Sequence, residues 1–328
     1  MTQAMLTRRA VLLGTGTSAL TLRGPSAQPA VDRLVRIVVG AAPGGGTDTI
    51  ARLLAEQLSG RYAPQVIVEN RPGASSRLAA EAVKAAAPDG TTLLVCPLPV
   101  LALYPHVLPR TTRYDPLADF TPAATIGELA YGFIVPRDHP ARDLPSFIEW
   151  GRSKGDVTFA PPVVGAPQHL LGLTFAQAAG LKVTVVTYRS ASLAMQDLIA
   201  GRLESYMNHM AEVSPQVRGG HARLLAVTSE HRLPGFPDVP SFAERGFAQV
   251  TAGEAFVVML PARAPRPVVA ALNAAVADAV ANTTTRDRLM QMQMTPMVLS
   301  TAETGARLAR EFAAWGPVVR ASGFTPEE

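Results

Sequence analysis

Apolar residues recur along the chain at two different spacings, which predict strands and helices in turn. Residues 35–39 are nearly all β-branched, which is typical of a strand that is covered on both faces. Residues 50–58 carry isoleucine and leucine at the three- and four-residue spacing of an amphipathic helix. A glycine-rich turn joins the two segments, so a strand–turn–helix unit is predicted here.

The turn itself, residues 40–48, contains three consecutive glycines at positions 44–46. Glycine lets the backbone turn tightly and approach a ligand, and the free N–H groups of the following helix favour an anion there. Thr47 or Asp48 is expected to cap the helix. The turn lacks the Gly-Lys-Ser/Thr of a P-loop and the G-x-G-x-x-G spacing of a dinucleotide site. A small-anion site and a plain connecting turn both remain open.

The same alternation continues along the chain and predicts parallel sheets with helical crossovers. Further strands are predicted at residues 65–68, 92–96, 131–135, 157–160, 183–187, 203–207, 223–228 and 256–260. Further helices are predicted at residues 75–86, 145–151, 169–180, 191–200, 268–281, 285–292 and 302–315. Residues 97–122 are rich in proline and weakly patterned, and no element is predicted there.

Two α/β units fit into 328 residues, and both are large enough to be domains. The chain is expected to cross between them near residues 131–136 and 252–256. These crossings give one domain of residues 31–133 plus 255–328, with residues 134–254 inserted as the second. The predicted fold class is therefore α/β, with two mixed or parallel sheets and a cleft between the lobes that is lined by strand ends.

The first 27 residues have the pattern of an export signal. Arg8 and Arg9 precede a short apolar run, small residues near Ala27 offer a cleavage site, and the arginine pair resembles a twin-arginine signal. Removing this segment takes three arginines and no acid from the chain, which leaves 27 of the 30 basic residues against 26 acidic ones. With so little net charge and no basic stripe, a nucleic acid partner is not expected.

Few side chains suggest catalysis or metal binding. The single cysteine, Cys96, has no partner for a disulfide and is expected to be a small buried strand residue. The six histidines lack the spacing of metal ligands, so neither a metal nor another cofactor is expected. A serine at position 190 or 192 could join His169 and Asp197 in a hydrolase triad, but the G-x-S-x-G turn of such enzymes is missing.

Seven segments together resemble the Bug proteins, the periplasmic solute receptors of tripartite tricarboxylate transporters. Each segment alone is weak evidence for the family. Together, their order and spacing match the family pattern over nearly the whole chain after the signal. The segments are Pro-Gly-Gly-Gly-Thr-Asp at 43–48, Val-Glu-Asn-Arg-Pro-Gly-Ala at 68–74, Ala-Pro-Asp-Gly-Thr-Thr-Leu-Leu at 87–94, and residues 114–122, 196–201, 225–229 and 237–244.

The resemblance implies a two-domain periplasmic-binding-protein fold, type II-like, that closes over a small carboxylate. One loop would hold a ligand carboxylate through backbone amides and ordered water; its residues are Ala41, Pro43, Gly44, Gly45, Gly46, Thr47 and Asp48. Segments of the second domain would complete the site; their residues are Gly165, Ala166, Pro167, Gln168, His169, Arg189, Ser190 and Asn208. Two roles stay open for His169, which either donates to the ligand or caps its own helix.

This chain departs from the family pattern at the far end of the expected pocket. Ala166 and Gln168 stand where serines are usual, and Asn208 stands where an aspartate is usual. We therefore expect the first carboxylate site to be kept while the distal end has lost hydroxyl groups. Each lost hydrogen bond to a charged group is worth about 1.5–3 kcal/mol. A monocarboxylate with an apolar or aromatic body is thus favoured over a di- or tricarboxylate.

Further departures lie in the first domain. Ala41 replaces an aromatic residue, and Ser75 and Ser76 replace a pair of glycines. Arg77 stands where asparagine is common. Arg77 or Arg189 is the candidate for a second contact with an anion.

The predicted function is an extracytoplasmic receptor, without catalysis, that captures a small carboxylate between its lobes. It would deliver this ligand to the membrane permease subunits of a tripartite tricarboxylate-type transporter. The alternative is a receptor that signals to a membrane sensor kinase, which the sequence does not separate from transport. Export implies a periplasmic location, and a monomer is expected.

Overall fold

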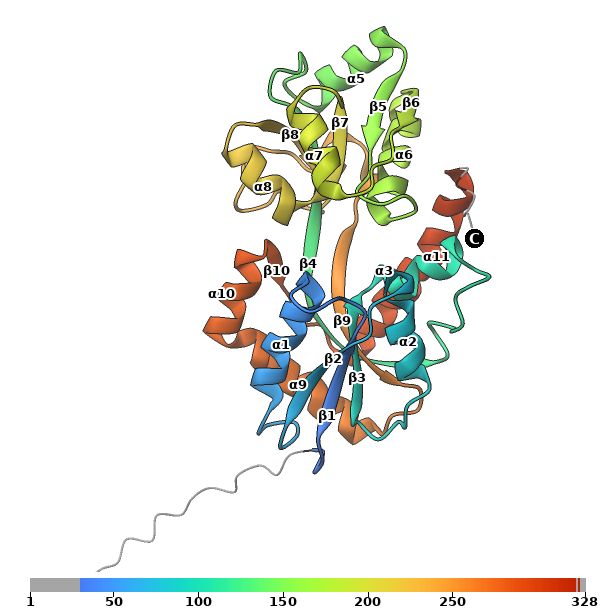
Figure 1. The fold of residues 1–328 in the computed structure, drawn as a ribbon, viewed down its shortest axis with the longest axis vertical. Coiled ribbons are helices and arrows are strands. Elements are labelled where there is room, and N and C mark those ends of the chain that lie inside the picture. The colour runs from blue at the N-terminus through green and yellow to red at the C-terminus, as the bar shows by residue number, and fades with distance from the viewer. Residues whose placement is uncertain (1–29, 323, 325–328) are drawn as a thin grey trace, which may run out of the picture.

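The computed structural model describes residues 30–322 and 324, which form two lobes joined by two long strands (Figure 1). The first and last described elements lie in one lobe, and the middle of the chain forms the other. We call these the terminal lobe and the middle lobe. The expected export signal at residues 1–27 lies outside the described residues.

The terminal lobe begins with the strand–turn–helix alternation that the sequence predicted. Its first elements are β1 (Val35–Val39), α1 (Gly46–Leu58), β2 (Val66–Asn70), η1 (Ala74–Ser76), α2 (Arg77–Lys84) and β3 (Thr92–Pro97). β1 lies between β2 and β3 and is parallel to both. Because its Val35, Ile37 and Val39 are fully buried, the β-branched run is a central strand as expected.

Two long strands cross from one lobe to the other. β4 (Phe120–Pro136) and β9 (Gly253–Pro261) pair antiparallel along most of the terminal lobe. β9 also pairs antiparallel with β3, and β4 continues into the middle lobe. The sheet is therefore mixed, and β4 belongs to both of its halves. The sequence predicted only residues 131–135 of β4, because its first part is rich in small residues and becomes extended through pairing with β9.

The middle lobe repeats the α/β pattern. Its elements are α5 (Leu144–Lys154), β5 (Val157–Ala160), α6 (Pro167–Ala179), β6 (Val183–Val185), α7 (Ala191–Ile199), β7 (Ser205–His209), α8 (Met210–Arg218), β8 (Ala222–Val227), η2 (Ala243–Arg245) and η3 (Ala248–Val250). β5 is parallel to β6 and β7, whereas β7 and β8 pair antiparallel with β4. Helix α8 was not predicted, because it contains Pro215 and buries only a few of its residues.

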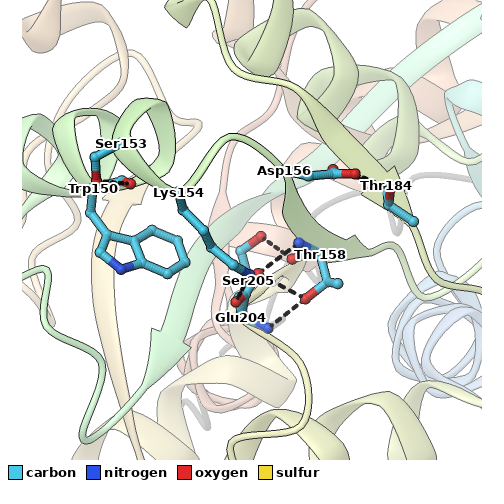
Figure 2. A network of polar contacts seen from close by, with 8 residues as sticks. All are labelled: Trp150, Ser153, Lys154, Asp156, Thr158, Thr184, Glu204 and Ser205. Atoms are coloured by element: carbon cyan, nitrogen blue, oxygen red, sulfur yellow. Dashed lines mark hydrogen bonds and ion pairs between the residues drawn. The ribbon is translucent and has the colours of Figure 1, made fainter.

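A polar network ties the amino ends of the middle-lobe strands together (Figure 2). The Glu204 carboxylate accepts hydrogen bonds from the backbone N–H and the hydroxyl of Thr158, at 2.8 and 3.2 Å, and it pairs with Lys154. The Ser205 hydroxyl donates to the Thr158 carbonyl at 2.9 Å. The network thereby links α5, β5 and β7 at the edge of the sheet opposite to the loops that follow these strands.

The last part of the chain and two short helices after β3 complete the terminal lobe. The remaining elements are α3 (Pro99–Ala102), α4 (Tyr104–Val107), α9 (Arg266–Ala281), α10 (Thr283–Gln291), β10 (Met294–Pro296) and α11 (Thr301–Ala321). One buried cluster joins Ile50 of α1 to Leu272 of α9, and another holds Leu308 and Trp315 of α11. α11 runs past its predicted end at residue 315, while α3, α4 and β10 were not predicted. Within residues 30–322, each helix is too short or too polar to cross a membrane.

Candidate functional site

Loops from both lobes face each other across the hinge strands. The loops after β1, β2 and β3 leave the same edge of the terminal lobe, because these strands are parallel, and that edge faces the middle lobe (Figure 1). The loops after β5, β6 and β7 leave the middle lobe toward the terminal lobe for the same reason. Ligands of α/β sheets bind outside the carboxyl ends of their strands. The space between these loops is therefore the candidate site.

The first loop ends in a helix start without a side-chain cap. α1 begins at Gly46, and Gly45 occupies the capping position with no side chain to accept from the helix N–H groups. The prediction that Thr47 or Asp48 caps this helix is therefore wrong. Gly44 has a φ of +83°, which L-residues rarely adopt, so the turn needs a glycine there. The uncapped N–H groups at this helix start are free to bind an anion.

Asp48 holds the loop in shape instead of capping the helix. Its side chain is 2% exposed and accepts hydrogen bonds from the Gly44 backbone N–H, the Arg52 Nε and the Asn70 Nδ2, each at 2.8 Å. The hydrogen bond from Arg52 is the main reason that the pKa of Asp48 is lowered to about 2. The carboxylate is thus ionised and fully engaged with protein donors, and it orients Gly44 for its turn.

The neighbouring loop after β2 is strained. Ala74, Ser75 and Ser76 all have a positive φ, between +46° and +69°. Left-handed backbone costs a non-glycine residue roughly 1–2 kcal/mol. Ser76 also packs directly on Gly40, where an added Cβ would lie 2.2 Å from the Ser76 Cβ. The two loops of the terminal lobe therefore fit together only because position 40 lacks a side chain.

Arg77 does not reach the space between the lobes. Its side chain is buried and donates to the Ala74 carbonyl at 2.9 Å and to the hydroxyls of Thr111 and Thr112. Arg189 is exposed, and it forms no hydrogen bond or ion pair with any residue that the structure describes. Of the two arginines considered for a second anion contact, only Arg189 is free to make one.

In the middle lobe, His169 stabilises the loop before α6. The capping position of α6 is Ala166, and the buried His169 Nδ1 accepts a hydrogen bond from the Gly165 backbone N–H at 3.1 Å. Burial lowers the pKa of His169, so its imidazole is neutral at neutral pH. Of the two roles left open, the structure thus favours a local structural one, although His169 ties down the loop and does not cap the helix itself.

Two further predicted residues have structural partners. Ser190 caps α7 by accepting from the Leu193 backbone N–H at 3.4 Å, and its hydroxyl lies 2.9 Å from that of Ser192. Asn208 is buried, donates to the Tyr206 hydroxyl and accepts from the His209 backbone N–H, both at 2.8 Å. Both polar atoms of the Asn208 amide are therefore occupied within the protein.

A cavity of about 230 Å³ lies between the lobes and brings some of the predicted residues together. Among those that line it are Pro97, Pro99, Val100, Tyr104 and Glu254 near the terminal lobe, and Ala166, Pro167, Gln168, Asn208, His209 and Glu212 from the middle lobe. The loop at residues 41–48, Gly165, His169, Arg189 and Ser190 do not line this cavity. The structure thus assembles the distal half of the predicted site, while the first loop stands beside it.

Sequence reasoning missed a polar pair on the wall of this cavity. Neither His209 nor Glu254 was among the predicted site residues. The His209 Nε2 lies 3.2 Å from the Glu254 Oε2, and the Tyr131 hydroxyl donates to the same oxygen at 2.7 Å. A glutamate at the start of the apolar run of β9 was the signal that could have drawn attention to this site.

A larger cavity of about 680 Å³ lies beside the hinge, between α11 and the loop at residues 229–234. Of the predicted site residues, only Pro167 lines it. Its partly buried charges satisfy each other, because Arg307 pairs with Glu128 at 2.5 Å and with Glu311 at 2.7 Å. The smaller cavity, which the strand-end loops surround, is therefore the better candidate for the ligand.

The residues considered for catalysis are not assembled. Asp197 accepts from Arg202 at 2.9 Å and from the Tyr188 hydroxyl at 3.0 Å, while the His169 Nδ1 is bonded to Gly165. Cys96 is fully buried in β3, as expected. Over the described part of the chain, histidine, cysteine and acidic residues form no group of three that could hold a metal ion.

The sequence and fold are similar to those of known receptors. The family model described as "Tripartite tricarboxylate transporter family receptor" matches residues 50–324. The protein BugT of Bordetella pertussis is 29% identical over 325 residues, which cover 97% of this chain and 98% of BugT.

Two of the similar solved structures contain a carboxylate. Rpa4515 of R. palustris with adipate is 28% identical, with a TM-score of 0.75 over 90% of this chain and 98% of that one. MatC of Rhodopseudomonas palustris with bound malate is 29% identical, with a TM-score of 0.71 over 88% of this chain and 99% of that one. The two-lobe α/β fold, the cleft and the match over most of the chain agree, and the chain belongs to the family of tripartite tricarboxylate transporter receptors.

Proposed function

We propose that this protein captures a small monocarboxylate between its two lobes and presents it to the membrane subunits of a tripartite tricarboxylate-type transporter. The observation that carries the proposal is the cavity formed by strand-end loops of both lobes, in a chain of this receptor family. Adipate and malate, the ligands of two similar structures, are both carboxylates. Export by the signal at residues 1–27, with cleavage near Ala27, would place the receptor in the periplasm. It would act there as a monomer.

The ligand carboxylate would bind at the start of α1. Gly46 and Thr47 offer backbone N–H groups there, because the first turn of the helix has no side-chain cap, and the positive end of the helix dipole favours an anion. Asp48 supports this role by holding Gly44 in its turn. Because residues 41–48 stand beside the cavity and do not line it, the lobes must close for one ligand to touch both sides.

The rest of the ligand would be largely apolar. Pro97, Val100 and Ala166 supply apolar wall to the cavity. Among the described residues that line it, Glu212 and Glu254 carry negative charge and only His209 can carry positive charge. A second carboxylate would meet this excess of negative charge, which supports a monocarboxylate over adipate- or malate-like acids.

Closure would be a hinge motion of the crossing strands. We propose domain boundaries at 31–133 plus 255–328 for one body and 134–254 for the other, because β4 and β9 are the strands that run between the lobes. Ligand bound to both lobes would favour the closed form by its added contacts.

Calorimetric titration tests the proposal with citrate, glutamate, malate and benzoate as ligands. We expect benzoate-like monocarboxylates to bind most tightly and small-angle scattering to show a more compact particle in their presence. Preferential binding of citrate would overturn the monocarboxylate preference. Failure of every carboxylate to bind, together with unchanged scattering, would overturn the receptor function itself. Mass spectrometry of the molecule that copurifies with the exported protein gives an independent identification.

A further inference from the structure

Gln168 places an unsatisfied polar group on the wall of the cavity. Its side chain is 2% exposed, and the Oε1 atom has no hydrogen-bond partner among residues 30–322 and 324. The Nε2 atom lies 3.5 Å from the His209 Nδ1. A buried amide atom without a partner destabilises the protein, so a group that lies unpaired on a cavity wall points to a ligand that completes it.

The orientation of this amide depends on His209, whose ring lies between Gln168 and Glu254. Its Nε2 is 3.2 Å from the Glu254 Oε2, and this oxygen also accepts from Tyr131. Glu254 is 8% exposed, and a buried carboxylate is stabilised when a cation lies against it. The groups that face the imidazole are Glu254 of β9, Tyr131 of β4, Gln168 of α6 and Glu212 of α8.

These surroundings favour the charged form of His209. Burial opposes the charge, but Glu254 and then Glu212 outweigh burial and raise the pKa of His209 above its ordinary value. Burial likewise opposes ionisation of Glu254, but the His209 charge lowers the pKa of this carboxyl below its ordinary value. The 3.2 Å contact between the His209 Nε2 and the Glu254 Oε2 is the geometry of an ion pair, and both shifts favour an imidazolium beside a carboxylate.

A charged imidazole fixes which end of the Gln168 amide faces the ligand. The imidazolium carries a proton on both nitrogens, so its Nδ1–H needs an acceptor, which only the carbonyl oxygen of the amide supplies. Amide oxygen and nitrogen are assigned from such networks. With the Gln168 oxygen turned to His209, the amide NH₂ occupies the place that has no protein partner.

We propose that Gln168 donates a hydrogen bond from its amide to the ligand, with His209 and Glu254 as positioning residues that keep the amide in this orientation. The ligand is then a monocarboxylate that carries a neutral acceptor oxygen, such as a ketone or amide carbonyl, at its far end. A second carboxylate is disfavoured because Glu212 and Glu254 share the cavity wall. This inference rests on the proposed function. It adds one polar oxygen to a ligand body that was expected to be apolar.

Three acids with the same heavy-atom skeleton test the proposal. They are 4-oxopentanoate, 4-methylpent-4-enoate, in which a methylene group replaces the ketone oxygen, and butanedioate, in which a carboxylate replaces the acetyl group. We expect calorimetry to show that 4-oxopentanoate binds roughly three- to tenfold more tightly than the methylene acid, as one neutral hydrogen bond allows. Butanedioate is expected to bind more weakly than 4-oxopentanoate.

The variant Gln168→Leu identifies the donor. It is expected to bring the affinity for 4-oxopentanoate down to that for the methylene acid and to leave the methylene acid unchanged. The matched control is Gln177→Leu, an exposed glutamine on the same helix, which should keep the wild-type preference. Circular dichroism and thermal melting of both variants report whether the fold is intact.

A pH series tests the positioning role of His209. A merely structural histidine would not make the preference for the ketone depend on pH. As pH rises through the pKa of His209, its Nδ1 becomes an acceptor, the amide turns its NH₂ back to the ring, and the preference for the ketone should fade. In Glu254→Gln this loss is expected at lower pH, because the carboxylate that favours the imidazolium is gone. Nitrogen NMR of His209 should show both ring nitrogens protonated at pH 6 without any ligand.

The outcomes separate the two proposals. Equal binding of the ketone and methylene acids, or a preference that survives in Gln168→Leu, overturns the role of Gln168 and leaves the receptor function standing. A neutral His209 at pH 6 overturns the positioning role. If none of the three acids binds to the intact protein while benzoate does, the oxo-acid ligand class is wrong and the receptor function stands. If benzoate and the other carboxylates fail as well, the receptor function itself is wrong.

Discussion

The Asp48 carboxylate accepts a hydrogen bond from the backbone N–H of Gly44 at 2.8 Å, so the third residue of α1 fixes the turn in front of its own helix. The same carboxylate also binds Arg52 and Asn70. A loop held from within in this way can present its remaining N–H groups to a ligand without first having to be ordered.

Asp48→Asn should weaken both the fold and the first binding loop. The substitution removes the negative charge to which the Arg52 side chain and the Gly44 N–H donate hydrogen bonds, which is expected to lower the free energy of unfolding by about 1–3 kcal/mol. Urea denaturation measures this change, and calorimetry should show weaker binding of the carboxylate ligand. Glu56→Gln is the matched control, because this glutamate is exposed on the same helix. A variant as stable as the wild type would show that Asp48 is dispensable.

The contribution of Asp48 should depend on pH. Its pKa is lowered to about 2 in the folded protein from an ordinary value of 3.8, so its carboxylate favours the folded state above about pH 4. This contribution is lost as pH falls from about 4 toward 2. The stability difference between wild type and Asp48→Asn, measured by denaturation from pH 6 to pH 2, should therefore shrink over that interval. A constant difference would exclude a depressed pKa.

Gly44→Ala and Gly60→Ala form a matched pair that separates binding from folding. Both glycines have a positive φ, +83° and +77°, and a Cβ added at either would meet no atom within 4 Å. Each alanine should therefore destabilise the protein by a similar ~1–2 kcal/mol through backbone strain alone. Only Gly44→Ala should also lower ligand affinity, since Gly60 follows the opposite end of α1. Equal ligand affinities of the two variants would show that the first loop does not contribute to ligand binding.

Glu204→Gln tests the network that ties the middle lobe together. Burial opposes ionisation of this carboxyl, but Lys154 and Thr158 outweigh it and lower the pKa of Glu204. Because a lowered pKa favours the folded state above the ordinary value of 4.5, the loss of stability should be largest at neutral pH and should fade in acid. We expect about 1–3 kcal/mol from the lost hydrogen bonds to charge. Glu149→Gln, at an exposed position of α5, should melt like the wild type.

Much of the architecture was encoded locally. The β-branched run at residues 35–39 and the helical spacing of Ile50, Leu54 and Leu58 predicted β1 and α1, because burial and period are properties of a short segment. By contrast, the first half of β4 and all of α8 were missed. Phe120 to Ala130 is extended because β9 lies beside it, and this pairing joins residues more than a hundred positions apart.

The features of the candidate site also fall into those encoded locally and those that depend on tertiary packing. The glycine turn at residues 44–46, the family pattern and the order of the strand-end loops follow from residue type and spacing along the chain. By contrast, packing between distant segments makes Asp48 hold the loop instead of capping the helix, and it turns Arg77 away from the cleft. The same packing brings together His209 of β7 and Glu254 of the crossing strand β9 beside Gln168. Such contacts depend on how distant segments pack, and no local pattern records them.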